Sequence, residues 1–485
     1  METLAINCNP MTSWSDLPTD ILIAIMSFMA PHDIIALRKV SRLLADTTRE
    51  RSVWIDALRR FCADNDVYAP SFSLEEMSTH ELEHAATGCR RFTSRLRTNF
   101  LRRNSVSPLS IRYSAHEEEF DRLRLIPGGR FVVTVSRCTL WLWDLGSSPK
   151  TSGVKLVTSC VISGVTMIHG LRIRASKYTS DALVFVSTTG SEGSFCLHVF
   201  SVLPHAQTPH FNLFSPVLSL PVENERPIIL GLTNQHIALC ADTSTVLWDF
   251  IHDCWISWRE PLADSENSCY ICNNNIVLVL NEAAQIYVAS LPALHPRSAS
   301  TSPPEIESLN ILQVHKLTRF DQSEQLVSCI DGMTRRFHGR ETSTAEEPMH
   351  IDVLSKDGTN NLISHFAVLP AAGSDTALCE LSALAQSPLE VSYLGSYCQH
   401  LQWIYPHFVL SFDIEGTTAL VSLIDLDGTS SASVLTGTLV APGLLEGEIC
   451  VDFCSFSGRG CARVPTSDNG GFKLMVMDYV LPKQS

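Results

Sequence analysis

The sequence contains no uninterrupted apolar run of the roughly eighteen residues that a membrane-crossing helix needs. It also has no N-terminal arrangement of basic, apolar and small residues of the kind that directs secretion. From these two absences we expect a soluble protein that works inside the cell, in the cytoplasm, the nucleus or both, without a membrane partner.

Positive charge is scarce. The 485 residues include 36 Lys and Arg against 51 Asp and Glu, which gives a formal charge of −15. The acidic excess lies after residue 112, because the chain up to that point has 14 Lys and Arg against 13 Asp and Glu. Proteins that hold nucleic acid by neutralising its phosphates need a positive surface. We therefore expect no nucleic-acid partner.

Signatures of catalysis are almost absent. The sequence has no G-x-S-x-G elbow, no P-loop and no G-x-G-x-x-G between a strand and a helix. Its one enzyme-like pattern is H-E-x-x-H from His80 to His84, which is typical of zinc peptidases. On a helix these histidines fall on the side opposite Leu82, together with Arg91 and Arg95, which would repel a dication. We expect no catalytic, cofactor-binding or metal-binding residues and no enzymatic activity, and a zinc peptidase is the rival hypothesis.

The sixteen cysteines do not form a disulfide framework. Most stand alone inside apolar runs, as Cys138, Cys196 and Cys240 do, which is typical of buried thiols. Only Cys269 and Cys272 have the spacing of a metal or redox site, and the second pair that a zinc ribbon requires is missing. We interpret this pair as two strand residues.

The strongest local pattern is the stretch 17–54, which predicts three short amphipathic helices. Pro18 stands at the start of the first helix, Pro31 ends it, Asp33 opens the second and Ser52 opens the third. About forty residues cannot bury all the apolar side chains of these helices internally. We therefore expect a partner to cover part of them.

The same stretch resembles an F-box. Matched positions run from the first helix to the third: Leu17, Pro18, Asp20, Ile21, Leu22, Ile25, Phe28, Pro31, Asp33, Leu37, Val40, Ser41, Arg42 and Trp54. Two departures are Met29, where the family usually has Leu, and Leu43-Leu44 after Ser-Arg. The resemblance implies docking on the Skp adaptor protein, which links F-box chains to a cullin and so to a ubiquitin-conjugating enzyme. The predicted docking residues are Leu17, Pro18, Ile21, Leu22, Ile25, Phe28, Leu37 and Val40.

A long helix is predicted over residues 79–103. Ser78 and Glu81 have the spacing of a capping box, in which each side chain satisfies a free backbone N–H of the first turn. Apolar residues then recur at helical spacing from Leu82 to Phe100. The basic cluster at its end is interpreted as favourable charge near a helix C-terminus or as a contact with the acidic remainder of the chain. Its members are Arg90, Arg91, Arg95, Arg97, Arg102 and Arg103.

From about residue 108 the pattern changes to short strands separated by turn residues. The pairs Trp143-Asp144 and Trp248-Asp249 each close a strand, turn and strand, and resemble the third strand of a WD-repeat blade. A blade cannot bury both faces alone, so the ring must close, and a strand at 109–113 is predicted to complete the last blade. Further third strands are predicted at 196–202, 285–289, 334–337, 377–381, 420–425 and 473–479.

Together these patterns predict an α+β multidomain fold. We expect an F-box helical domain over residues 1–62, a linker with the long helix over 63–107, and an all-β propeller of seven blades, alternatively eight, over 108–485. The resemblance implies a substrate-recognition adaptor of a Skp–cullin–F-box ubiquitin ligase, whose propeller binds a protein substrate of unknown identity. The alternative is a non-catalytic propeller scaffold that acts in complex assembly without ubiquitin transfer. We expect no cofactor.

Overall fold

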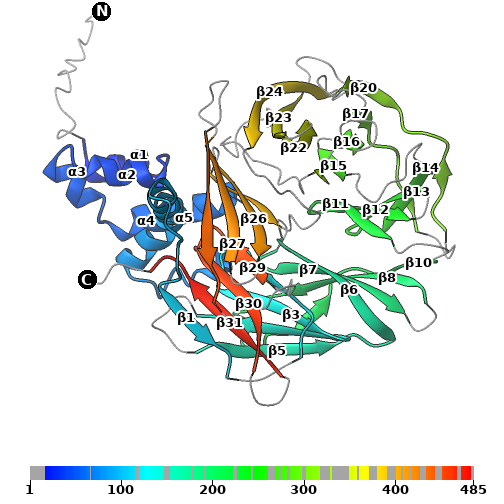
Figure 1. Cartoon of the computed structure of the whole chain (residues 1–485), viewed down its shortest axis with the longest axis horizontal. Helices are drawn as coiled ribbons and strands as arrows, with labels where there is room; N and C mark the ends of the chain where they lie inside the picture. The colour runs from blue at the N-terminus through cyan, green and yellow to red at the C-terminus, as the bar shows by residue number, and fades with distance from the viewer. Residues whose placement is uncertain are drawn as a thin grey trace, which may run out of the picture.

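A computed structural model gives the fold of the chain (Figure 1). Among the described residues, no helix is both long and apolar enough to cross a membrane. The description covers residues 17–481 except 66, 116–118, 147–152, 177–178, 191–192, 222–226, 242–243, 260–267, 273–274, 281–284, 298–301, 317–327, 330–348, 358–359, 371–378, 390–399, 406–407, 416–417, 426–432, 443–450 and 467–470.

The N-terminal region is helical, but its second predicted helix is broken in two. Ser41 caps a separate helix by accepting a hydrogen bond from the Leu44 N–H at 3.2 Å. The predicted roles of Pro31 and Asp33 are also wrong, because Pro31 is the first residue of the second helix, where a missing N–H costs nothing. The helices of this region are α1 (Thr19–Met26), α2 (Pro31–Leu37), α3 (Arg42–Thr47) and α4 (Arg51–Asp64), followed by a 3-10 turn, η2 (Ala69–Ser71).

The long helix α5 (Thr79–Leu101) begins where the sequence predicted and ends two residues earlier. The predicted capping box is confirmed. The Glu81 N–H donates to Ser78 Oγ at 3.3 Å, and the Ser78 N–H donates to Glu81 Oε2 at 2.8 Å.

The described residues after α5 form seven sheets, whose strands pair antiparallel with one exception, β14 with β19. The first two sheets consist of β2 (Arg122–Leu125), β3 (Phe131–Ser136), β4 (Thr139–Asp144) and β5 (Lys155–Val161), and of β6 (Val165–Ala175), β7 (Ala182–Gly190), β8 (Phe195–Val202), β9 (Phe211–Leu213) and β10 (Leu218–Leu220). The third and fourth consist of β11 (Ile228–Leu232), β12 (His236–Ala241), β13 (Ser244–Asp249), β14 (Cys254–Arg259), β18 (His295–Pro296) and β19 (Glu305–Ile306), and of β15 (Ser268–Cys272), β16 (Asn275–Leu280), β17 (Gln285–Ser290) and β20 (Ile311–Lys316). The fifth, sixth and last consist of β21 (Ser328–Cys329), β22 (Met349–Asp357), β23 (Asn360–Pro370) and β24 (Cys379–Leu389), of β25 (His400–Tyr405), β26 (Phe408–Glu415), β27 (Thr418–Asp425) and β28 (Ser433–Val440), and of β29 (Val451–Cys454), β30 (Arg459–Pro465), β31 (Phe472–Asp478) and β1 (Ser110–Tyr113).

This architecture confirms the predicted α+β fold, with helices first and sheets after them. Six of the predicted third strands are the third strand of their sheet: β4, β8, β13, β17, β27 and β31. The prediction for 377–381 is wrong, because β24 is the fourth strand of its sheet and β23 is the third. An alternating apolar run marks a strand without marking its rank in a sheet. The strand predicted at 334–337 lies outside the described residues, so the blade count stays a prediction.

The last sheet is completed by a strand from before the first sheet. β1 pairs antiparallel with β31, with Ser110 opposite Asp478 and Tyr113 opposite Met475. Side chains reinforce the join, since the buried Asp478 accepts from Arg459 Nε at 2.6 Å and from Arg112 at 3.0 Å. Arg459 also donates to backbone carbonyls of the first sheet's turns, at 2.8 and 2.9 Å. The first and last sheets are thus bound by both backbone and ionic contacts.

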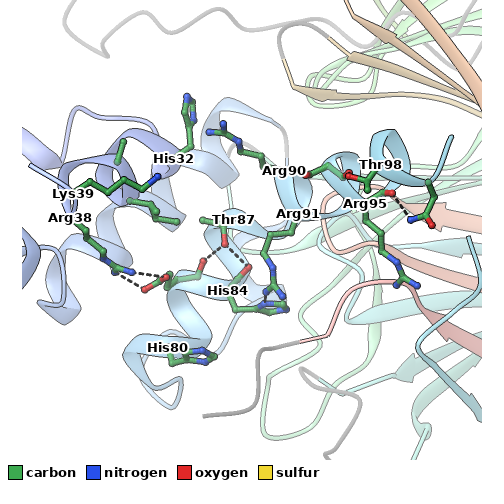
Figure 2. Close-up of a pocket in the computed structure, with 15 residues that line it drawn as sticks. His32, Arg38, Lys39, His80, His84, Thr87, Arg90, Arg91, Arg95 and Thr98 are labelled. Atoms are coloured by element: carbon green, nitrogen blue, oxygen red, sulfur yellow. Dashed lines mark hydrogen bonds and ion pairs between the residues drawn. The ribbon is translucent and has the colours of Figure 1, made fainter. Parts of the chain in front are cut away.

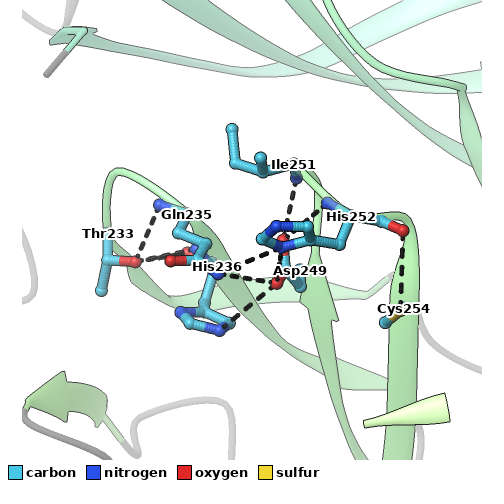
Figure 3. A network of polar contacts seen from close by, with 7 residues as sticks. All are labelled: Thr233, Gln235, His236, Asp249, Ile251, His252 and Cys254. Carbon is cyan, nitrogen blue, oxygen red and sulfur yellow. Dashed lines mark hydrogen bonds and ion pairs between the residues drawn. The ribbon is translucent and has the colours of Figure 1, made fainter. Parts of the chain in front are cut away.

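The Asp of each Trp-Asp pair closes the turn that follows its strand. Asp144 accepts from the Gly146 N–H at 2.7 Å, and Asp249 accepts from the backbone N–H groups of Ile251 and His252 at 2.9 and 3.0 Å. Figure 3 shows the Asp249 carboxylate among its partners. Burial raises the pKa of Asp249, but hydrogen bonds from Gln235 and His252 more than offset this, so its pKa lies below the usual value.

The helices share one apolar core with the sheets at the two ends of the β region. The Phe92 ring of α5 lies 5.1 Å from that of Phe453, and the Phe61 ring of α4 lies 5.9 Å from that of Phe456. In Figure 1 the blue helices accordingly lie beside the orange and red strands. The segment 63–107 is therefore packed against the sheets and is not a free spacer, which fixes the helices in place.

Candidate docking surface

Four large apolar side chains between the start of α1 and the end of α3 are exposed. Ile21 is 44% and Ile25 36% exposed, and they stand one turn apart on α1, on the same side of the helix. Phe28, just after α1, is 66% exposed, and Val40, between α2 and α3, is 69% exposed. We call these four the exposed apolar set. Single exposed apolar residues are ordinary, but four within twenty positions favour a protein-binding surface.

Another side of the same helices is buried. Leu22, Met26 and Ile34 pack in the shared core with Trp54 of α4. The helices therefore carry apolar residues on two sides, of which one is buried in the core of the described residues. This is the physical basis for expecting a partner.

The structure separates the predicted docking residues into surface and core positions. Pro18 is exposed as the residue before α1, and Leu17 and Leu37 are partly buried against the core. Leu22 is only 1% exposed. The docking role predicted for Leu22 stays a prediction, and its side chain is packed inside this chain.

Polar contacts hold this helical region rigid. Both carboxylate oxygens of Glu83 on α5 accept from Arg38, at 2.9 and 2.7 Å. The Arg38 guanidinium also lies over the Trp54 ring, 5.5 Å from its centroid. The Trp54 indole N–H donates to the Thr48 carbonyl at 2.7 Å, and Arg60 donates to the Met29 carbonyl at 2.6 Å. The exposed apolar set is thus presented on a fixed frame.

The H-E-x-x-H residues are engaged in contacts within this chain. Glu81 belongs to the capping box, and the ring Nδ1 of His84 contacts the Arg91 guanidinium. His80 is exposed. A cation beside His84 would repel a zinc ion, so the geometry argues against a zinc site here.

The search for other metal sites covers only the described part of the chain. There, no group of three or more His, Cys, Asp or Glu side chains is placed to hold a metal ion. Cys269 and Cys272 both lie in β15, as the interpretation of a strand pair requires.

The fold defines the class of this chain as a helical head joined to a propeller-like series of antiparallel sheets, completed by a strand from its own beginning. The head contains an F-box domain, since the F-box domain family matches residues 14–56. The predicted F-box is therefore confirmed.

Known structures resemble the fold at low sequence identity. The WD40 domain of SCAP from fission yeast is 9% identical with a TM-score of 0.38, covering 75% of this chain and 82% of that one. A chain of a humanized mutant of the Chaetomium thermophilum Polycomb Repressive Complex 2 is 8% identical with a TM-score of 0.44, covering 78% and 98%. The AfRom2 CNH domain is 12% identical with a TM-score of 0.33, covering 77% and 98%. Among curated proteins no match was found. We take no function from these likenesses.

Proposed function

We propose that this chain is the substrate-recognition adaptor of a Skp–cullin–F-box ubiquitin ligase. The observation that carries the proposal is the F-box domain at residues 14–56, together with the exposed apolar set that it presents. The F-box docks on the Skp adaptor protein and through it on a cullin, and the sheets bind a protein substrate. The chain itself performs no chemistry and works inside the cell, in the cytoplasm, the nucleus or both.

The proposed mechanism is proximity. Holding substrate lysines beside the charged ubiquitin carrier raises their effective concentration, and this requires a fixed distance between the F-box and the substrate. The core that α4 and α5 share with the last sheet supplies such a fixed distance. In this scheme the F-box region, residues 1–62, docks on the Skp adaptor. The linker, residues 63–107, sets the distance between the F-box and the substrate, which is bound by residues 108–485.

The docking surface that we propose is the exposed apolar set with Pro18, Leu17 and Leu37 at its border. Leu22 is left out because it belongs to the core. Truncating a central apolar side chain of an interface typically weakens the binding free energy by more than about 1 kcal/mol.

Copurification tests the proposal. The affinity-tagged full chain is expressed in cells, and the eluate is probed for Skp and for a cullin. We expect both, and we expect Ile21→Asp with Ile25→Asp to remove both by placing charge where apolar contact is needed. The matched control is Val161→Asp with Met167→Asp, which are 65% and 52% exposed on β5 and β6.

The outcomes separate the two functional hypotheses. Skp without a cullin in the wild-type eluate favours the scaffold that assembles complexes without ubiquitin transfer. The absence of both from the wild-type eluate contradicts the docking proposal itself.

A further inference from the structure

A groove of about 760 Å³ lies between α2 and α5 (Figure 2). One wall comes from α2 and the turn after it, and the other comes from α5 between His80 and Asn99. None of the exposed apolar set lines this groove. It is therefore a second surface of the helical region, separate from the one proposed for Skp.

The lining of the groove is strongly basic in a chain whose formal charge is −15. It holds five Lys and Arg side chains and a single carboxylate, that of Glu83. Both oxygens of this carboxylate accept from Arg38. Among the lining residues, four cations form no ion pair with this carboxylate: Lys39, Arg90, Arg91 and Arg95. Of these, Arg91 lies near enough to Glu83 for that carboxylate to raise its pKa.

Two of these four cations are oriented by backbone carbonyls. Arg91 donates to the Leu481 carbonyl at 2.8 Å, and Arg95 donates to the carbonyls of Tyr479 and Ser107, the latter at 2.9 Å. A carbonyl positions a guanidinium without cancelling its charge, so the positive potential of the groove persists. The C-terminal end of the described chain thereby fixes the wall formed by α5.

The other two cations lie at the rim. Lys39 and Arg90 are exposed. Figure 2 shows the Arg90 side chain directed toward His32 on the opposite wall. Burial lowers the pKa of His32, Asp33 raises it and Arg90 lowers it further, which places the Arg90 charge close to that ring. The exposed Arg90 guanidinium therefore supplies positive charge at this rim of the groove, which favours an anionic ligand.

The remaining lining favours a peptide over a nucleic acid. Ile35 and Ala36 of α2 supply an apolar strip, and Thr87, Ser94 and Thr98 of α5 supply hydroxyl groups. None of the lining residues is Phe, Tyr or Trp, so the groove lacks the aromatic platforms on which bases stack. A basic groove between two helices with an apolar strip suits a peptide with acidic and small apolar residues.

We propose that the groove between α2 and α5 binds an acidic peptide segment of a partner protein. Carboxylates of the segment pair with Lys39 and Arg90 at the rim and with Arg91 and Arg95 deeper in, through charge-assisted hydrogen bonds. The proposal does not rest on the function proposed above, because the two surfaces share none of their residues.

The test is fluorescence anisotropy with the purified full chain and a labelled peptide of about twelve alternating Glu and Ala residues. We expect saturable binding that weakens with added salt. Lys39→Glu with Arg90→Glu is expected to raise Kd by about tenfold or more, because it places like charge opposite the ligand. The neutral pair Lys39→Gln with Arg90→Gln is expected to raise Kd by a smaller factor, in the same direction.

The matched control is Lys155→Glu with Arg102→Glu, which changes the charge equally at exposed positions outside the groove. It is expected to leave Kd within about twofold. Circular dichroism spectra and melting temperatures confirm that all three variants are folded. The proposal is overturned if the wild-type chain does not bind the peptide saturably, or if the control weakens binding as much as the groove variants. A single-stranded oligonucleotide that binds more tightly than the peptide, with the same dependence on Lys39 and Arg90, overturns the peptide assignment in favour of nucleic acid.

Discussion

At the scale of single residues, Asp478 is a buried carboxylate that pairs with two arginines. Its carboxylate is almost fully buried and accepts from both Arg112 and Arg459, which are 13% and 6% exposed. Removing one partner of a buried pair leaves the other charge uncompensated. The carboxylate therefore matters most for the join between the first and last sheets.

Asp478→Ala is expected to lower the free energy of unfolding by about 3–5 kcal/mol, because the buried Arg459 and the partly buried Arg112 lose their counter-charge. Urea denaturation measures this. The control is Asp121→Ala, whose carboxylate is 71% exposed and lies 3.9 Å from Arg463, with an expected cost below about 1 kcal/mol. Equal losses in the two variants would contradict the role given to Asp478.

A pH dependence follows from buried histidines. His198 is 7% exposed, contacts Thr188 Oγ1 at 3.2 Å, and its pKa is lowered by burial. The unfolded state thus binds a proton at a pH where the folded state does not, so stability is full above a pH of about 6.5 and falls as the pH drops below it. The pKa values of the partly buried His236 and of His205, which lies at the surface, are lowered as well.

We expect the urea concentration at the unfolding midpoint of the wild-type chain to decrease as the pH is lowered from about 8 to about 5.5. The fall should be smaller in His198→Gln, whose amide can still contact Thr188 but does not titrate. The same fall in both proteins would show that His198 does not contribute to it.

Leu22 shows what sequence pattern alone cannot decide at this scale. In a helix that is apolar on two sides, the spacing of Ile21 and Leu22 is equally compatible with core and surface. Only the packing of α1 on α4 separates them. The Trp-Asp turns, in contrast, were predictable because each Asp carboxylate accepts a hydrogen bond from a backbone N–H only two residues further along the chain.

At the scale of elements, α5 packs closely on the sheets. A Cβ added at Gly437 of β28 would lie 2.0 Å from the Phe100 ring of α5. Gly437→Ala is therefore expected to destabilise the chain by about 1–3 kcal/mol through overpacking, as measured by urea denaturation. Gly153→Ala is the control, because its Cβ would meet no atom within 4 Å. A neutral Gly437→Ala would mean that α5 does not pack here.

Helix starts were predictable where capping chemistry is complete in the sequence. Ser78 and Glu81 fix the start of α5 because both partners lie within one turn. The start of α3 was missed although Ser41 carries the same local signal, because the apolar residues on either side keep helical spacing across the break. The groove between α2 and α5 had no signal, since its walls are more than forty residues apart in sequence.

At the scale of the whole molecule, the F-box and the sheets act as one packed unit. Apolar residues of α1, α4 and α5 lie in the same core as residues of the first and last sheets. The predicted linker therefore holds the F-box in a fixed position relative to the sheets and does not let the two move freely. This rigidity could not be predicted from the sequence, where a capped amphipathic helix is compatible with either a spacer or a packed element.

The central claim is that the exposed apolar set docks on Skp, and isothermal titration calorimetry of the full chain with purified Skp tests it most directly. Phe28→Ala with Val40→Ala is expected to raise Kd by about tenfold or more, since each anchor contributes more than about 1 kcal/mol. Val161→Ala with Leu213→Ala, exposed on the sheets, is expected to leave Kd unchanged. An absence of Skp binding by the wild-type chain, or an unchanged Kd for Phe28→Ala with Val40→Ala, would contradict the account.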